Sequence, residues 1–117
     1  MRAIICFGPS KNRWLRKFLS RDFQHCFVIL YTGGKALVVD PAPNFVIYRI
    51  YDEDKVHAYG REICHAVSVE VKENDTSMFG IHTCVSHIKR IIGLDKRWIL
   101  TPRQLYNEVK KWDCQSI

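Results

Sequence analysis

Short hydrophobic runs bounded by turn residues recur along the chain as far as Val71. Such runs, rich in Val, Ile, Phe and Tyr, are typical of β-strands. They predict strands at residues 3–7, 25–31, 36–39, 44–51 and 63–71. Gly33 and Gly34 separate the second run from the third, and this pair predicts a tight hairpin, because both turn positions need a positive φ.

Helical spacing of hydrophobic residues marks two segments between these strands. Ser10 caps a predicted basic amphipathic helix whose buried stripe includes Trp14 and Phe18. Residues 52–59 begin with acidic side chains and predict a short helix. Each of these helices therefore connects two predicted strands.

The C-terminal part of the chain predicts two more helices. Thr83 caps a helix from Cys84 to Ile92, and Gly93 stands where a C-terminal cap belongs. The apolar stripe of this helix comprises Val85, Ile88, Ile91 and Ile92. The last helix begins at Thr101-Pro102, since Pro is favoured at the first helical position. Its inward-facing residues are Leu105, Val109 and Trp112.

The order of these elements, β-α-β-β-β-(α)-β-α-α, is typical of the α+β class. We expect an antiparallel sheet of about four strands packed against helices. The length of 117 residues, with 47% hydrophobic and 26% charged residues, suits a single domain over residues 1–117. A domain of this size buries enough surface to fold without a disulfide or a metal, so we expect neither metal nor cofactor.

The charge of the chain is positive, with a formal net charge of +6. The Lys and Arg residues are scattered, and no block of five like charges occurs. Positive charge attracts polyanions in general, so nucleic acid is a candidate partner. Solvated helix faces explain the scattered positions of the Lys and Arg residues better than a nucleic-acid-binding patch does. Nucleic acid is therefore not the favoured partner.

Five cysteines make an odd number without a CxxC spacing: Cys6, Cys26, Cys64, Cys84 and Cys114. The first apolar run is too short for a signal peptide, and basic residues follow it at once. The longest uninterrupted apolar stretch, Cys26 to Tyr31, is far shorter than the roughly 20 residues of a membrane span. We therefore expect a soluble, cytoplasmic protein with free thiols and no membrane span.

Cys84 is the candidate nucleophile. It stands in the first turn of a predicted helix, where unpaired backbone amides and the helix dipole favour a thiolate and can also hold an oxyanion. The competing interpretation is a small buried residue, which is the commoner role of a single cysteine. A partner with suitable geometry is needed to favour catalysis.

His25 and Asp40 supply such a partner. If Gly33 and Gly34 form a two-residue turn, Phe27 pairs with Asp40 across the hairpin, and His25 shares a face with Phe27. Asp40 is then diagonal to His25 on one face, at about 7–8 Å between backbones, which the two side chains can bridge. An ionised Asp40 would fix the tautomer of His25, so that its other ring nitrogen can take the thiol proton.

The order of these residues resembles that of permuted papain-like enzymes, in the NlpC-like and lecithin retinol acyltransferase-like branch. In that order a histidine lies on an early strand, a polar residue lies on the next strand, and a cysteine opens a later helix. The similar segments are Phe23–Val28, Leu37–Pro41, Thr83–Gly93 and Leu100–Tyr106, which look like those of small phage and bacterial proteins of this kind.

The resemblance implies a permuted papain-like fold and a thiol hydrolase or acyltransferase acting on an amide, peptide or ester bond, for example a cell-wall peptidase. It gives His25 the role of base, Asp40 the orienting role and Cys84 the role of nucleophile. The asparagine before the nucleophile in the acyltransferases is Thr83 here, and their histidine in the third role is Asp40, so the substrate class does not carry over.

Two other interpretations compete with this one. His82, Cys84 and His87 are close in sequence, and Cys64-His65 could complete a zinc site, although HxCxxH is not a usual zinc spacing. The second alternative is an inactive papain-like subunit that is structural or binds nucleic acid in a phage virion or other bacterial assembly. A hyper-reactive thiol would favour the enzyme, and salt-sensitive binding to heparin without such a thiol would favour the subunit.

Overall fold

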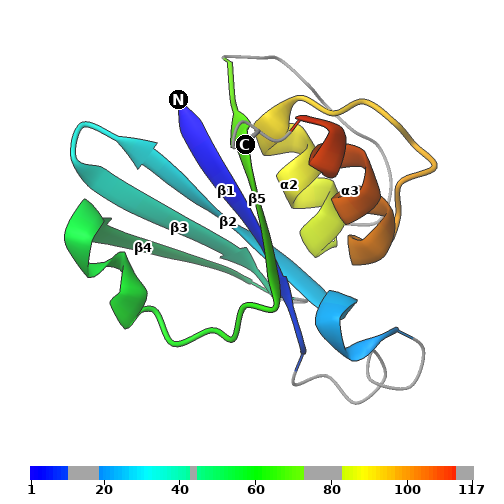
Figure 1. Ribbon diagram of the computed structural model, residues 1–117, viewed down its shortest axis with the longest axis horizontal. Coiled ribbons are helices and arrows are strands. Elements are labelled where there is room, and N and C mark those ends of the chain that lie inside the picture. Colours follow the sequence, from blue (N-terminus) through cyan, green and yellow to red (C-terminus); the bar gives the residue numbers. More distant parts are fainter. Residues whose placement is uncertain (11–18, 43–44, 73–82, 113–117) are drawn as a thin grey trace.

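A computed structural model describes residues 1–10, 19–42, 45–72 and 83–112 of the chain, and within them the fold is α+β (Figure 1). The strands are β1 (Arg2–Gly8), β2 (His25–Thr32), β3 (Lys35–Pro41), β4 (Val46–Asp52) and β5 (His65–Glu70). They form one antiparallel sheet in the order β4-β3-β2-β1-β5. The helices are α2 (Cys84–Ile92) and α3 (Pro102–Val109), with 3-10 turns η1 (Arg21–Phe23), η2 (Glu53–Ala58) and η3 (Lys110–Trp112).

The sheet has five described strands, so the expected count of about four was too low. Each of the five lies where the sequence predicts a strand, and β1 pairs with β2 on one side and β5 on the other. A short, fully hydrophobic run such as residues 3–7 suits this central position, because both of its faces are covered. The α+β class is confirmed, as is the antiparallel sheet packed against helices.

The hairpin of β2 and β3 has the expected register. Thr32 pairs with Lys35 and Val28 with Val39, around a turn in which Gly33 and Gly34 have φ of 56° and 76°. Two positive φ values suit a two-residue turn whose twist matches the strands, and glycine adopts them without steric cost. This register places Asp40 on the same face of the sheet as Phe27.

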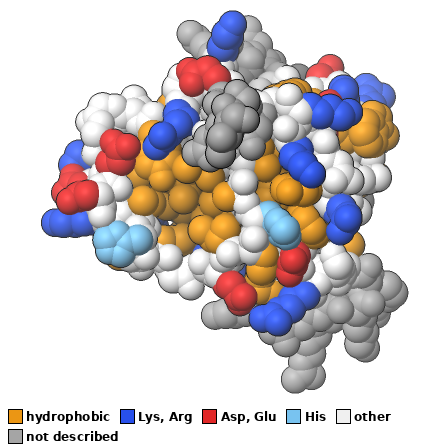
Figure 2. Space-filling model, in the orientation of Figure 1, with side chains coloured by type: hydrophobic (Ala, Val, Ile, Leu, Met, Phe, Trp, Pro, Cys, Tyr) orange, Lys and Arg blue, Asp and Glu red, His pale blue; other side chains and the backbone are white. Residues whose placement is uncertain are grey.

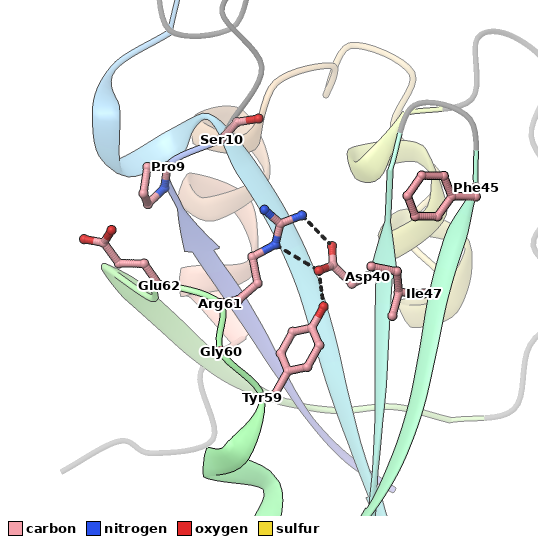
Figure 3. Close-up of a pocket in the computed structure, with 9 residues that line it drawn as sticks. All are labelled: Pro9, Ser10, Asp40, Phe45, Ile47, Tyr59, Gly60, Arg61 and Glu62. Carbon is pink, nitrogen blue, oxygen red and sulfur yellow. Dashed lines mark hydrogen bonds and ion pairs between the residues drawn. The ribbon is translucent and has the colours of Figure 1, made fainter.

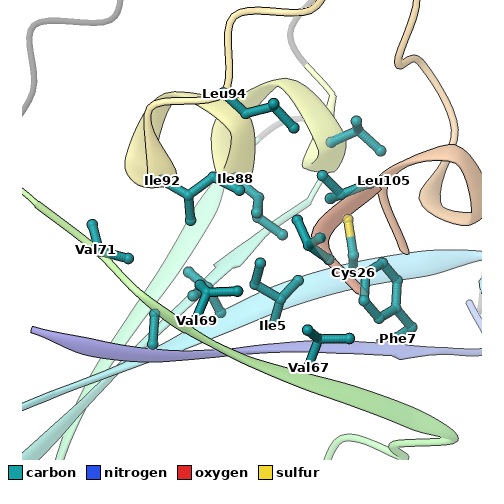
Figure 4. Close-up of a cluster of buried hydrophobic side chains, with 14 of the residues drawn as sticks. Ile5, Phe7, Cys26, Val67, Val69, Val71, Ile88, Ile92, Leu94 and Leu105 are labelled. Carbon is teal, nitrogen blue, oxygen red and sulfur yellow. The ribbon is translucent and has the colours of Figure 1, made fainter. Parts of the chain in front are cut away.

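One face of the sheet packs against α2 and α3 and forms the larger core (Figure 4). The strand residues on this face are hydrophobic at alternate positions, as the sequence predicts. They include Ala3, Ile5, Phe7, Cys26, Val28, Val67 and Val69. The Cys26 side chain points from β2 toward the helices in this view. Residues of β2 with even numbers therefore face the helices.

The opposite face holds a smaller core. Cys6, Phe27, Ile29, Ala36 and Val38 are buried there, and Val56 and Tyr59 from η2 and its end pack against them. Residues 52–59 were predicted as a short helix, and they form the 3-10 turn η2. This turn brings the chain that follows it toward the ends of β2 and β3.

Helix α2 begins and ends as predicted. The Thr83 hydroxyl accepts a hydrogen bond from the Ser86 N–H at 3.1 Å, and Ser86 bonds back to the Thr83 N–H. Gly93 closes the helix with φ of 75°. This reciprocal cap fixes Cys84 as the first residue of the helix.

Lys89 is buried in the helical layer, although a lysine would be expected on the solvent face of α2. Its ammonium donates hydrogen bonds to the carbonyls of Lys96 at 2.9 Å and Ile99 at 2.8 Å. Burial lowers the pKa of this ammonium. Through these hydrogen bonds, Lys89 holds the segment between α2 and α3 close to α2.

Helix α3 begins at Pro102 with a Thr101 cap, as predicted. Leu105 and Val109 are fully buried, but Trp112 is 37% exposed, so its expected inward position was wrong. The chain changes from α-helix to the 3-10 turn η3 after Val109, which shifts the direction of the side chains that follow. The predicted helix with Trp14 and Phe18 lies outside the described residues.

The visible surface carries hydrophobic side chains near its centre, with charged side chains around them (Figure 2). The Lys and Arg side chains in this view stand at separate places rather than in one block. Among the described residues, none of the helices has the length and apolar character that crossing a membrane requires.

Candidate active site

Cys84 lies at the N-terminus of α2, over the start of β2. Its side chain is half-buried and packs against the larger core. The sulfur lies beside the side chains of His25 and Cys26, the first two residues of β2, and interacts electrostatically with both. The structure therefore brings the predicted nucleophile and the predicted base into contact.

His25 meets Asp40 on its other side. The Nε2 atom of His25 lies 2.5 Å from Oδ1 of Asp40, and both residues are buried, with Asp40 fully inaccessible. Because Nε2 is engaged by the carboxylate, Nδ1 is the nitrogen available to Cys84. Cys84, His25 and Asp40 thus lie next to one another in this order, and their catalytic roles stay a prediction.

Asp40 has two further partners that the sequence did not indicate (Figure 3). The Tyr59 hydroxyl donates to Oδ2, and the Arg61 guanidinium donates to Oδ2 at 2.9 Å and to Oδ1 at 3.4 Å. Every oxygen of this buried carboxylate therefore has more than one donor, which holds it in a fixed orientation.

Gly8 permits this arrangement. A β-carbon added at Gly8 would stand 2.3 Å from the carbonyl oxygen of Glu62, far inside van der Waals contact. The absence of a side chain lets the segment after η2 pass close to the end of β1, where the Cys64 N–H donates to the Phe7 carbonyl at 2.8 Å. Arg61 is carried on this segment and so reaches Asp40.

The pKa values of Asp40, His25 and Cys84 follow from these contacts. Burial raises the pKa of Asp40, but hydrogen bonds from His25, Arg61 and Tyr59 outweigh it and lower the value to about 2. Burial lowers the pKa of His25, but the interactions with Asp40 and Cys84 raise it by more, so that the pKa is about 8. Near neutral pH, His25 is thus an imidazolium beside an ionised Asp40.

The pKa of Cys84 lies well below that of an ordinary thiol. The largest cause is a hydrogen bond from the Cys26 thiol, and a bond from His25 and its positive charge add to it, against the opposing effect of burial. The Cys26 backbone N–H also donates to the sulfur. These interactions favour a Cys84 thiolate paired with a His25 imidazolium.

Alternation along β2 puts Cys26 on the strand face opposite His25. What the sequence pattern missed is that this face carries α2, so Cys26 also meets Cys84. The available signal was the parity of β2: Cys26 alternates with Val28 and Leu30, whose hydrophobic side chains indicate the helix-covered face.

An open pocket of about 650 Å³ lies beside the chain of contacts (Figure 3). Asp40, Tyr59 and Arg61 form part of its wall, and the remaining lining residues are Pro9, Ser10, Phe45, Ile47, Gly60 and Glu62. Its wall combines aromatic and aliphatic side chains with the charges of Arg61 and Glu62. A peptide-sized group could bind in a space of this volume.

The described members of the proposed zinc site do not assemble into one. His82 lies outside the described residues, and His87 is half-buried on α2. The part of the chain that the structure describes contains no group of three or more His, Cys, Asp or Glu side chains placed to hold a metal. Cys64 and His65 lie instead beside Asp22, whose carboxylate is 3.1 Å from His65 Nε2.

Comparison of the chain with family models, with curated protein sequences and with solved structures finds no match. The geometry of the site is therefore the guide to the function of the protein.

Proposed function

We propose that the protein is a thiol hydrolase or acyltransferase that acts on an amide, peptide or ester bond. Cys84 is the nucleophile, His25 the acid and base, and Asp40 the residue that orients His25. The observation that carries this proposal is the position of His25 between Cys84, with which it interacts, and Asp40, whose carboxylate lies 2.5 Å from His25 Nε2. Nucleophile, base and orienting acid in contact are the requirement for this chemistry.

The reaction begins with attack of the Cys84 thiolate on the carbonyl carbon of the substrate. The resulting oxyanion needs donors, and the backbone N–H groups of Cys84 and Val85 at the start of α2 supply them, because they precede the Ser86 N–H that the Thr83 hydroxyl caps. The imidazolium of His25 then donates its proton to the leaving amine or alcohol, and a thioester forms on Cys84.

The thioester is resolved by water or by another acceptor. His25, now neutral, takes the proton of the acceptor as it attacks, and Cys84 leaves as a thiolate. Asp40 keeps Nε2 bonded throughout, so that Nδ1 stays directed at the reacting atoms. Whether water or an amine or alcohol accepts the acyl group decides between hydrolase and acyltransferase.

The order of the three residues supports a papain-like enzyme in permuted order. His25 begins β2, Asp40 lies on the adjacent β3, and Cys84 opens a helix later in the chain. The expected NlpC-like or acyltransferase-like relationship rests on this order together with the antiparallel sheet.

The test is to detect an acyl-enzyme. The protein is mixed with p-nitrophenyl acetate and, separately, with panels of peptide, isopeptide and ester donors, and nitrophenolate release and intact mass are recorded. We expect a burst of about one equivalent and an acyl group on Cys84. The matched variants are Cys84→Ala, which should give no burst, and Cys64→Ala, which should behave as the wild type.

Two results would contradict the proposal. An acyl group found on another residue would refute the nucleophile assignment. No burst, together with alkylation of Cys84 no faster than that of Cys64, would favour an inactive subunit of a phage or bacterial assembly.

A further inference from the structure

Cys26 is a second thiol in contact with the proposed nucleophile. It is fully buried on the helix face of β2, in the larger core against which Cys84 packs, and its side chain interacts with the Cys84 sulfur. The acyl-transfer steps give the Cys26 thiol no covalent role. A neutral thiol thus stands directly beside a thiolate, which is the arrangement that disulfide formation requires.

We propose that Cys84 is a peroxide-sensitive modification site, and that Cys26 resolves its oxidised form as a reversible Cys26–Cys84 disulfide. The disulfide would switch the nucleophile off and protect it from irreversible oxidation. This inference goes beyond the proposed function, because it needs the thiolate and its neighbour but no acyl donor.

The chemistry balances with hydrogen peroxide as the oxidant. The Cys84 thiolate attacks one peroxide oxygen, the O–O bond breaks, and hydroxide leaves while Cys84 becomes a sulfenic acid. The Cys26 sulfur then attacks the Cys84 sulfur, the S–O bond breaks, and the departing oxygen takes the Cys26 proton and leaves as water. The two thiols have lost two electrons to one peroxide.

The surroundings assign different roles to the two sulfurs. Cys84 is partly exposed at the start of α2, so a small oxidant can reach it. Cys26 has no exposed surface, and burial together with the neighbouring Cys84 sulfur raises its pKa well above that of a free thiol. Oxidation therefore begins at Cys84, and Cys26 can act only on a sulfur already in contact with it.

The other described cysteines lack this combination. Cys6 is buried on the opposite face of the sheet, where burial raises its pKa to about 12. Cys64 is partly exposed, but burial and the nearby Asp22 carboxylate raise its pKa, so less thiolate is present. Neither is in the larger core beside Cys84.

The experiment maps the products of mild oxidation in the full chain. Reduced protein is treated with about one equivalent of hydrogen peroxide, denatured in N-ethylmaleimide, digested without reductant and analysed by mass spectrometry. We expect a peptide pair joined through Cys26 and Cys84, the loss of two thiols per chain, and full recovery with dithiothreitol. A Cys84 sulfenic or sulfinic acid beside an unoxidised Cys26, or a disulfide through another cysteine, would overturn the proposal.

Two alanine variants of buried cysteines on adjacent strands provide the matched pair. Cys26→Ala should let dimedone trap the Cys84 sulfenic acid and should convert peroxide damage from reversible to irreversible. Cys6→Ala removes a buried thiol from the other face and should give the wild-type disulfide. If Cys26→Ala does not fold, the wild-type disulfide map still decides.

This outcome is separable from that of the acyl-enzyme test. The disulfide is detected by mass and needs no acyl donor. A chain that forms the disulfide but no acyl-enzyme would keep this inference and refute the proposed function, and the reverse result would do the opposite.

Discussion

The described part of the molecule contains two sets of one cysteine, one histidine and one aspartate, and they differ in almost every physical respect. In the first, Cys84 contacts His25, which contacts Asp40 at 2.5 Å, with side-chain exposures of 9% for His25 and 0% for Asp40. In the second, His65 and Asp22 are 3.1 Å apart and 36% and 49% exposed. Identical residue types therefore do not make equivalent sites.

The position of the carboxylate explains the difference. Asp40 touches the histidine and not the cysteine, so its charge favours an imidazolium that in turn stabilises the Cys84 thiolate. Asp22 bonds to both His65 and Cys64, and a carboxylate beside a thiol disfavours the thiolate. Proximity of three residues is thus insufficient, and their order along the hydrogen-bonded chain decides what they can do.

Substitution of the cysteines gives the largest expected contrast. Cys84→Ala should abolish the acylation burst, a loss of about 10⁵-fold or more by analogy with serine triads, whereas Cys64→Ala should leave it unchanged. Single-turnover release of nitrophenolate measures both. His25→Ala combined with Cys84→Ala should cost little more than Cys84→Ala alone, because the residues act as one unit. An additive loss would contradict this interpretation.

Substitution of the aspartates gives the next contrast. Asp40→Asn keeps the shape but presents an amide that can hold His25 in the wrong tautomer, so the acylation rate should fall by about 10²–10⁴-fold. Asp22→Asn should change it less than about twofold, since Asp22 touches neither His25 nor Cys84. Equal effects of the two substitutions on the acylation rate would show that the buried pair of His25 and Asp40 has no special role.

The pH dependence of alkylation sharpens the comparison further. Because the pKa of Cys84 is depressed, its thiolate persists as the pH falls from 8 toward 6, whereas the raised pKa of Cys64 makes its thiolate decline about tenfold per unit. Iodoacetamide at about pH 6 should therefore label Cys84 about 10–100-fold faster than Cys64. Timed quenching and peptide mapping check this, and labelling of Cys64 first would contradict it.

The smallest contrast concerns two arginines. Arg61 bonds to Asp40, and its charge lowers the pKa of His25, which is about 8. Arg61→Gln should therefore reduce acylation about tenfold and move any change in Cys84 alkylation that follows His25 deprotonation to higher pH. Arg21 makes only an exposed 3.5 Å pair with Glu62, so Arg21→Gln should do neither. A loss of rate with no shift of the profile would indicate a merely structural role for Arg61.

The sequence predicts the elements that carry the three central residues, because each depends on a local signal. Thr83 and Gly93 bound α2 and place Cys84 at its start. The Gly-Gly turn fixes the register of β2 and β3, and simple alternation then brings Asp40 to the side of His25. Local signals of this kind act within a few residues and need no knowledge of packing.

The contacts that depend on packing could not be predicted in this way. Tyr59 and Arg61 reach Asp40 from an irregular segment, whose path has no periodicity to interpret and depends on the close approach at Gly8. Lys89 is buried because carbonyls from the segment after α2 accept hydrogen bonds from its ammonium, whereas lysine side chains are usually exposed. To predict the contact of Cys26 with Cys84, one must know how closely α2 packs on the sheet. Alternation along a strand gives the face of a side chain but not this distance.

The turn between β2 and β3 has a consequence for how the chain can vary in length. Two residues are the shortest common hairpin connection, so an inserted residue can be accommodated by a longer loop, but a deleted one cannot. Loss of Gly33 or Gly34 would force the strands to slip by one position, and such a slip turns every side chain of one strand to the other face. Asp40 would then leave His25, although the deletion lies at the far end of the hairpin. Descendants of this chain can therefore gain residues at the turn and keep the site, while those that lose one residue there cannot.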